Sequence, residues 1–372
     1  MADAFPQEGN TPVDRAAGKG KNYLPTLDGW RALAILCVIP AHGQAFLPPT
    51  AQHIVDVAGY RAVEMFFALS GLLICGLLLR EEERTGGIRL SDFYLRRLFR
   101  IQPAALTYLL FLAIAGLLGL VPTLWQGILG SILMVRNLWP HNEGLGAWFT
   151  GHYWSLSVEE HFYLLLPAFL VLVRRRRLAL LGALFVLQIL WAIQVRRHPA
   201  LQTFRGNVDL RTDLRCGPIL MGCIAALLLQ QARWKQLAQR FFLPSLAIAY
   251  AVAVCWRLEV HHSTYDNVAL CTVYPTLLVS TMLHPASLVS RALEWAPLRF
   301  VGRISFSLYL WQQFFFIWNQ PAAPGSFRSH WFLCGCLTFV CATASYYLVE
   351  LPMVRLGHQV AARRREQRAA TI

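Results

Sequence analysis

The feature that most constrains the fold of this chain is a series of long apolar runs. Residues 106–121, 178–195, 241–255 and 332–349 contain no charged side chain. Each run approaches the length of about 20 residues that a helix needs to cross the hydrocarbon core of a bilayer. Together with a hydrophobic content of 56%, these runs predict an all-α, polytopic membrane protein.

We expect about ten transmembrane helices. Residues 124–138 are also apolar but short, and we expect a re-entrant or interfacial helix there, because an eleventh span would place the basic run at 174–177 outside. The expected spans are residues 28–47, 61–79, 101–121, 153–173, 178–195, 213–231, 241–258, 268–284, 303–319 and 330–349.

Basic charge indicates the orientation of these spans. If the N-terminus is inside, most of the 34 lysines and arginines fall on the cytoplasmic side, as the positive-inside rule requires. We therefore expect both termini in the cytoplasm, with a disordered tail at 1–26, a membrane domain at 27–356 and a basic tail at 357–372.

The outer loop at 196–211 is an exception to the positive-inside rule. It either anchors an anionic ligand, contacts lipid headgroups or marks an error in the topology.

Composition also argues against several classes of function. The net charge of +14 would suit nucleic acid, but no basic groove with interleaved aromatic residues is visible. The nine cysteines are scattered without a CxxC pair, which is typical of small buried residues, so we expect no metal site and no permanently bound cofactor. The lack of an internal repeat disfavours a transporter built from repeated halves.

Two ionisable residues, Arg31 and His42, fall within the first expected span, where such groups are costly and by default functional. On a helix they share one face and are separated by about 16 Å of rise. Arg31 lies at the cytoplasmic mouth, where it either serves a ligand or extends toward lipid headgroups. For His42 the alternative to a functional role is a hydrogen-bonded packing histidine.

Glu64 lies near the outer start of the second expected span, at about the same depth as His42 by helical rise. Sequential antiparallel helices would bring the two side chains into contact. The carboxylate would then orient the imidazole and stabilise its protonated form, as the acid does in a hydrolytic triad. The alternative is that Glu64 faces the outer water.

Two further carboxylates, Glu159 and Glu160, enter the helix expected at 153–173. Ser155 and Tyr163 lie one turn on either side of Glu159 and share its face, whereas Glu160 points about 100° away. We expect one of the carboxylates to pair with an arginine and the other to line a binding pocket.

Arg97 and Arg100 lie three residues apart at the cytoplasmic end of the third expected span, so they can share a helix face. They form either an ordinary positive-inside cluster or a fork that binds phosphate groups bidentately. Their spacing alone favours neither interpretation.

These segments, taken in order, resemble the signature of the acyltransferase 3 family, which comprises bacterial integral membrane O-acyltransferases. Each motif is short, but seven in order between residues 24 and 356 are specific. Residues 27–34 resemble LDGLRGLA with its R-x10-H to His42, residues 64–74 resemble DxFFVLSGFLI with Glu64 for the usual Asp, and Arg97 and Arg100 match RxxR. Residues 154–163 resemble WSLSVEEQFY, residues 212–222 TDTRxDxLLxG, residues 304–313 ISYSLYLWHQP, and residues 350–352 ExP.

Three positions depart from the family pattern. Gln312 replaces a frequent histidine, His161 a glutamine and Gly217 a frequent aspartate, so we do not expect these positions to be catalytic. The hydrolase-like domain that is fused to some members is not seen, so we expect a stand-alone membrane transferase.

The resemblance implies transfer of a short acyl group, most simply acetyl from acetyl-CoA, to a hydroxyl of an exported or lipid-linked glycan at the bacterial inner membrane. His42 and Glu64 would be catalytic, with His42 acting either as a general base or through an acyl-imidazole. The acyl-CoA would bind Arg31, Ser70, Arg97 and Arg100. The acceptor would bind Glu159, Glu160, Arg215 and Tyr309.

Two other functions remain open at this level. A transporter or flippase also uses histidine, glutamate and arginine within the membrane. An acyltransferase that modifies a small molecule, such as an antibiotic, would share the same motifs. The sequence does not indicate the oligomeric state.

Overall fold

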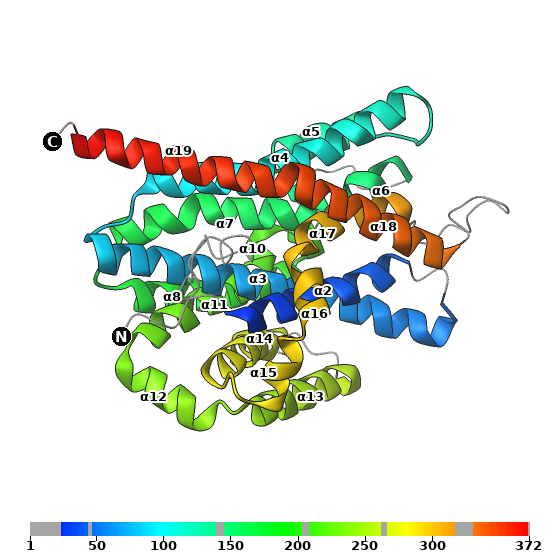
Figure 1. The fold of residues 1–372 in the computed structure, drawn as a ribbon. Helices are drawn as coiled ribbons and strands as arrows, with labels where there is room; N and C mark the ends of the chain where they lie inside the picture. Colours follow the sequence, from blue (N-terminus) through cyan, green and yellow to red (C-terminus); the bar gives the residue numbers. More distant parts are fainter. Residues whose placement is uncertain are drawn as a thin grey trace. The chain divides into compact units, whose positions relative to one another are not determined.

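The computed structural model (Figure 1) is helical and contains no strand in the residues that it describes, which confirms the expected all-α class. Most of the expected tail at 1–26 and part of the outer loop at 196–211 lie outside the described residues. The structure describes residues 24–43, 47–138, 145–202, 208–261, 266–316 and 330–370.

Among the described residues, five helical stretches are long and apolar enough to cross a membrane, which agrees with a polytopic membrane protein. The bent pair α12 (Ala232–Phe241) and α13 (Pro244–His261), at 77°, gives a sixth if it counts as one span. The number ten therefore stays a prediction. The five stretches contain α3 (Pro49–Thr85), α4 (Leu90–Leu117), α7 (Tyr153–Leu172), α8 (Arg177–Arg197) and α18 (Trp331–Ser345).

Several elements differ in length from the expected spans. Helix α3 begins at Pro49, well before the expected start at residue 61, so helical rise from that start does not fix the depth of Glu64. Helix α5 (Trp125–Ile132) has 8 residues and is too short to cross a bilayer, as expected for the segment 124–138. Helix α19 (Leu351–Ala370) continues through most of the expected basic tail.

The remaining elements are short or only moderately long. They are α2 (Pro25–His42), η2 (Arg136–Leu138), α6 (Leu145–Gly151), α9 (Pro199–Gln202), η3 (Val208–Leu210), α10 (Thr212–Arg215), α11 (Gly217–Gln230), α14 (Asp266–Leu283), α15 (Leu288–Leu293), α16 (Ala296–Arg303), α17 (Ser305–Phe315) and η5 (Tyr346–Glu350).

The chain divides into two compact units that are built from interleaved segments. Three of the five boundaries between them fall inside α2, α3 and α7, and the other two fall between helices. The first unit comprises Met1–Ala34, Arg61–Ile88 and Val158–Arg303. The second unit comprises Ile35–Tyr60, Arg89–Ser157 and Ile304–Ile372.

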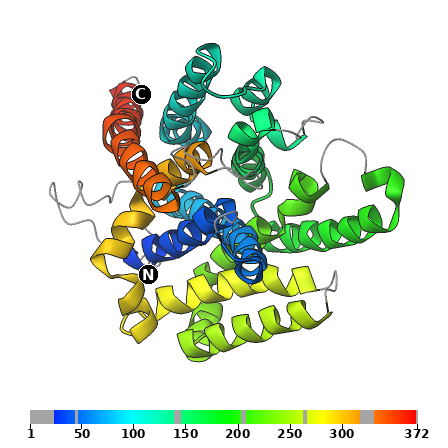
Figure 2. The same cartoon turned by 90° about the vertical axis from the view of Figure 1, so that its right-hand side faces the viewer.

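In the first unit, α3 and α11 pack with their backbones in near contact. A Cβ atom at Gly71 of α3 would overlap the backbone of Ile219, and one at Gly222 of α11 would overlap the backbone of Ala68. Small residues let membrane helices approach this closely. In the same unit, Figures 1 and 2 show α13 and α14 side by side.

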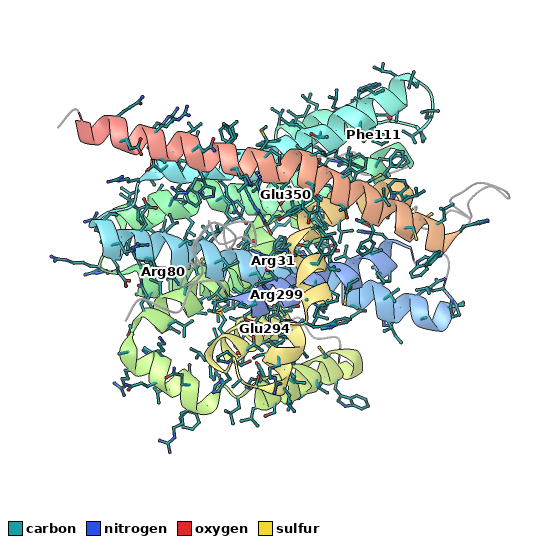
Figure 3. All side chains as sticks on the ribbon, in the orientation of Figure 1. Arg31, Arg80, Phe111, Glu294, Arg299 and Glu350 are labelled. Atoms are coloured by element: carbon teal, nitrogen blue, oxygen red, sulfur yellow. The ribbon has the colours of Figure 1, made fainter. Side chains whose placement is uncertain are left out.

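In the second unit, α18, η5 and α19 form one long helix that runs beside α4 (Figure 1). The π-helical turn η5 lies immediately before Pro352. Proline removes a backbone N–H from a helix, and a local π turn is one way in which a helix accommodates that loss. Glu350, labelled in Figure 3, is the last residue of this turn and is only 1% exposed.

Candidate active site

The candidate active site of the second unit is centred on His42, the last residue of α2. Its Nδ1 lies 2.8 Å from Oε1 of Gln312, a buried residue of α17, and Nε2 of Gln312 donates to the carbonyl oxygen of Tyr309 at 3.5 Å. Because the amide nitrogen is used there, its oxygen faces His42 and Nδ1 carries the proton. The lone pair of His42 then lies on Nε2, which has no hydrogen-bond partner in the described part of the chain.

The aromatic and amide neighbours of His42 form a closed hydrogen-bond network between α6 and α17. The ring of Trp148 meets the imidazole edge-on at 5.4 Å, and its Nε1 donates to the carbonyl oxygen of Phe316 at 2.8 Å. Nε2 of Gln313 donates to the carbonyl oxygen of Trp148 at 2.6 Å, and its Oε1 accepts from the backbone N–H of His152 at 3.1 Å. These hydrogen bonds fix the side chains around His42.

Tyr309, which the sequence assigned to the acceptor, belongs to the same cluster as His42. Its hydroxyl lies 2.6 Å from Oγ of Ser155 and donates to the carbonyl oxygen of His152 at 3.0 Å. The structure therefore brings together a predicted catalytic residue and a predicted substrate-binding residue.

The predicted catalytic residue Glu64 lies in a buried cluster of the first unit. Its Oε1 accepts from Arg215 at 3.0 Å, and its Oε2 accepts from the hydroxyl of Tyr274 at 2.5 Å and from Arg61 at 3.3 Å. Both members of the Glu64–Arg215 ion pair are buried. The sequence assigned Glu64 to the orientation of His42 and Arg215 to the acceptor, whereas the structure pairs the two with each other.

Glu159 forms a second polar cluster in the first unit, with Ser70 and Tyr163. Its two oxygens accept from the hydroxyls of Ser70 at 3.1 Å and Tyr163 at 2.8 Å, and the oxygens of the Tyr163 and Ser70 hydroxyls lie 2.8 Å apart. The expected proximity of Tyr163 to Glu159 is observed. Ser70, assigned to the donor, is thus joined to a residue assigned to the acceptor. Glu160 is half-buried beside Glu159 on α7.

The arginines assigned to the donor have carboxylate partners in two cases. Arg31, labelled in Figure 3, pairs with Asp28 at 3.3 Å and remains partly exposed. Arg100 of α4 pairs at 3.4 Å with the buried carboxylate of Glu350, which also accepts from Ser307 at 2.9 Å. Arg97 is half-buried on the same helix as Arg100.

Sequence reasoning missed several residues of these clusters. Gln312 was set aside because the family often has histidine there, yet both side chains can hydrogen bond a neighbouring imidazole, and that shared property was the available signal. Glu350 was known only as part of the ExP motif. His152 and Arg136 lie outside the family motifs.

The fold and the site define a polytopic, helical membrane protein with a half-buried imidazole whose Nε2 has no hydrogen-bond partner among the described residues. A family model described as an acyltransferase domain matches residues 24–347. The chain therefore belongs to the acyltransferase 3 family.

Comparison with characterised proteins points in the same direction. The chain is 28% identical over 369 residues to the peptidoglycan O-acetyltransferase OatA of Listeria monocytogenes, covering 93% of this chain and 58% of that protein. It is 28% identical over 379 residues to the O-acetyltransferase OatA of Staphylococcus aureus, covering 94% and 61% respectively. A putative O-acetyltransferase of the same species is 27% identical over 368 residues.

The chain spans 58% to 61% of the length of these two OatA relatives. No solved structure matches the chain.

Proposed function

We propose that this chain is an integral membrane O-acetyltransferase that moves an acetyl group from acetyl-CoA to a hydroxyl of a cell-envelope glycan. Family membership and the names of the relatives support acetyl transfer and a glycan acceptor. The observation that carries the proposal is the state of His42. Its Nδ1 is held by Gln312 and its Nε2 has no partner among the described residues, as a general base requires.

In the proposed reaction, Nε2 of His42 accepts the proton of the acceptor hydroxyl while the hydroxyl oxygen attacks the thioester carbonyl carbon. Gln312 keeps Nδ1 protonated, so that Nε2 is the only basic nitrogen of the ring. General base catalysis of this kind contributes about 10²–10⁴-fold to the rate. An acyl-imidazole on His42 is the alternative to direct transfer, and a labelled acetyl group trapped on the protein would reveal it.

The donor is proposed to enter from the cytoplasmic side of a bacterial inner membrane, with both termini of the chain on that side. Its phosphates would contact Arg97 and Arg31, and Ser70 would help to position it. Arg100 would serve the phosphates only by exchanging or sharing its ion pair with Glu350. Guanidinium groups suit this role because they bind phosphate bidentately.

The acceptor is proposed to enter from the opposite side, where Tyr309, Glu159, Glu160 and Arg215 would contact its sugar or lipid-linked part. Glu64 would act as a positioning residue, because it holds the guanidinium of Arg215 from inside the protein. In this role Glu64 affects catalysis through Arg215.

Purified protein in proteoliposomes tests the proposal. Acetyl-CoA with a labelled acetyl group is supplied on one side, and fragments of cell-envelope glycan are supplied on the other. The proposal predicts a labelled glycan and free CoA, with acetyl-CoA and glycan consumed together. A protein that binds no CoA but moves unmodified glycan across the bilayer would be a flippase, and the proposal would be wrong.

A further inference from the structure

A buried histidine between α6 and α7 has no well-aligned hydrogen bond at its ring nitrogens. His152 is 2% exposed, and neither Nδ1 nor Nε2 makes such a bond in the described part of the chain, although the side chain of Gln313 lies beside this residue. Leaving a buried polar group without a hydrogen-bond partner destabilises the folded state. An unsatisfied polar group in a folded protein needs a physical explanation. A bound substrate can supply the missing hydrogen-bond partner.

The orientation of the His152 ring is fixed by aromatic packing. The rings of Tyr108, Tyr153 and Tyr309 contact it edge-on, with centroid distances of 5.3, 4.9 and 5.5 Å. The backbone of His152 is held as well, because its N–H donates to Gln313 and its carbonyl oxygen accepts from Tyr309. The ring is therefore positioned without using either nitrogen, which is the condition for a preorganised hydrogen-bond donor.

A buried cation lies close to this ring. Arg136 is 1% exposed, and its guanidinium donates to Oγ1 of Thr150 at 3.1 Å and to the carbonyl oxygen of Ala147 at 3.2 Å. Among the described residues, no carboxylate forms an ion pair with it. Both hydrogen-bond partners of Arg136, Thr150 and Ala147, lie within five residues of His152 in the chain, so the cation lies in the same part of the second unit. A buried positive charge without a counter-ion favours a negative charge that develops nearby.

The same imidazole lies near the proposed base. His42 contacts the ring of Trp148, and Gln313 bonds both the carbonyl oxygen of Trp148 and the backbone N–H of His152, all within the second unit. Gln312 and Gln313 are adjacent on α17 and hold the ring of His42 and the backbone of His152, respectively. One short segment therefore fixes the spacing of the two imidazoles.

We propose that the free N–H of His152 donates a hydrogen bond to the carbonyl oxygen of the acyl donor as that oxygen becomes an oxyanion. Arg136 is the positioning residue that stabilises this charge through His152. The inference rests on the proposed acetyl transfer and adds the group that holds the negative charge.

The step balances as follows. The hydroxyl oxygen of the acceptor forms a bond to the thioester carbon, the hydroxyl proton moves to Nε2 of His42, and the carbonyl electron pair moves to the oxygen that His152 binds. The tetrahedral intermediate then collapses. The carbon–sulfur bond breaks, the CoA thiolate leaves with that electron pair, and the proton on His42 returns to the sulfur.

Two variants at position 152 and one control variant separate a hydrogen-bond donor from a packing residue. His152→Phe keeps an aromatic ring among the three tyrosines but removes both nitrogens. His152→Gln restores an N–H donor without the ring. The control is His161→Gln on α7, the helix that follows His152, because His161 bonds Thr212 in the first unit and glutamine is frequent there in the family.

The assay is acetyl transfer from acetyl-CoA in proteoliposomes, with kcat and KM measured for each variant and folding checked by thermal unfolding. We expect His152→Phe to lower kcat by about 10²–10³-fold, the loss typical of one oxyanion donor, with the KM for acetyl-CoA unchanged. His152→Gln should recover at least about tenfold of that loss. His161→Gln should behave as wild type.

The inference is overturned if folded His152→Phe transfers acetyl at a rate near wild type, or if its defect lies in KM alone. If His152→Phe does not fold, His152→Gln is the deciding variant. A folded His152→Gln protein that is as inactive as His42→Ala protein would contradict a donor role for His152. Arg136→Met removes the positive charge and should lower kcat. Arg136→Lys keeps the charge and should retain most of the kcat that Arg136→Met loses. If wild-type protein transfers no acetyl group, the proposed function itself fails.

Discussion

Nδ1 of His42 lies 2.8 Å from Oε1 of Gln312, a residue 270 positions away in the sequence. The contact fixes the tautomer of the imidazole, because an amide oxygen can only accept a hydrogen bond. Gln312→Leu keeps the size of the side chain but removes that acceptor. We expect kcat to fall about tenfold or more, which corresponds to about 1.4 kcal/mol for one lost hydrogen bond.

The matched variant is Gln312→His, which restores an acceptor and the residue frequent in the family. It should keep most of the wild-type activity. Equal activity of Gln312→Leu and wild type in the proteoliposome assay would show that the amide does not orient His42.

The buried pair of Glu64 and Arg215 should dominate the stability of its surroundings. Removing one partner of a buried ion pair leaves an uncompensated charge and costs about 3–5 kcal/mol. We expect Glu64→Gln and Arg215→Gln each to lower the Tm of the detergent-solubilised protein markedly. The double variant should be less destabilised than the sum of the two, because neither charge is then left alone. Additive effects in this cycle would mean that the 3.0 Å pair contributes little.

Arg97 and Arg100 can be tested separately for donor binding and for stability, because Arg100 pairs with the buried carboxylate of Glu350. We expect Arg97→Ala to weaken CoA binding in calorimetry by about 1.5–3 kcal/mol, the loss of one charge-assisted contact. Arg100→Ala should lower Tm as well, since it leaves the carboxylate of Glu350 without its cation.

Arg96→Ala serves as the control for the loss of one positive charge on α4. If all three variants bind CoA with wild-type affinity, the arginines of α4 act only as a topology signal.

Topology can be tested with reporter fusions. Fusions after residues 177 and 372 should both report the cytoplasm, since helix α5 is too short to add a span. A fusion after residue 177 that reports the outer side would mean that the segment 124–138 crosses the membrane.

The sequence was enough to predict the helical membrane class, because lipid leaves few alternatives for long apolar runs. It also singled out His42, Glu64 and Arg215 as ionisable residues within or at the ends of the expected spans. Pairing was harder to predict. Equal depth by helical rise favoured a contact between Glu64 and His42, but the carboxylate binds Arg215 and Tyr274.

Two physical reasons account for what the sequence did not reveal. Helix α3 starts at Pro49, so the depth of Glu64 did not follow from the apolar run alone. The partners of His42 and Arg100 come from α17 and η5, near the end of the chain, and only tertiary packing brings Gln312 and Glu350 to them. His152 gives no signal in sequence because its lack of partners is a property of the folded state.

The most direct test of the central claim is acetyl transfer by His42→Ala protein in proteoliposomes, with CoA affinity measured on the same sample. The account predicts that transfer falls by at least about 10²-fold while CoA still binds, because the base is lost and the donor site is not. His42→Ala protein that folds, binds CoA and transfers acetyl at the wild-type rate would contradict it.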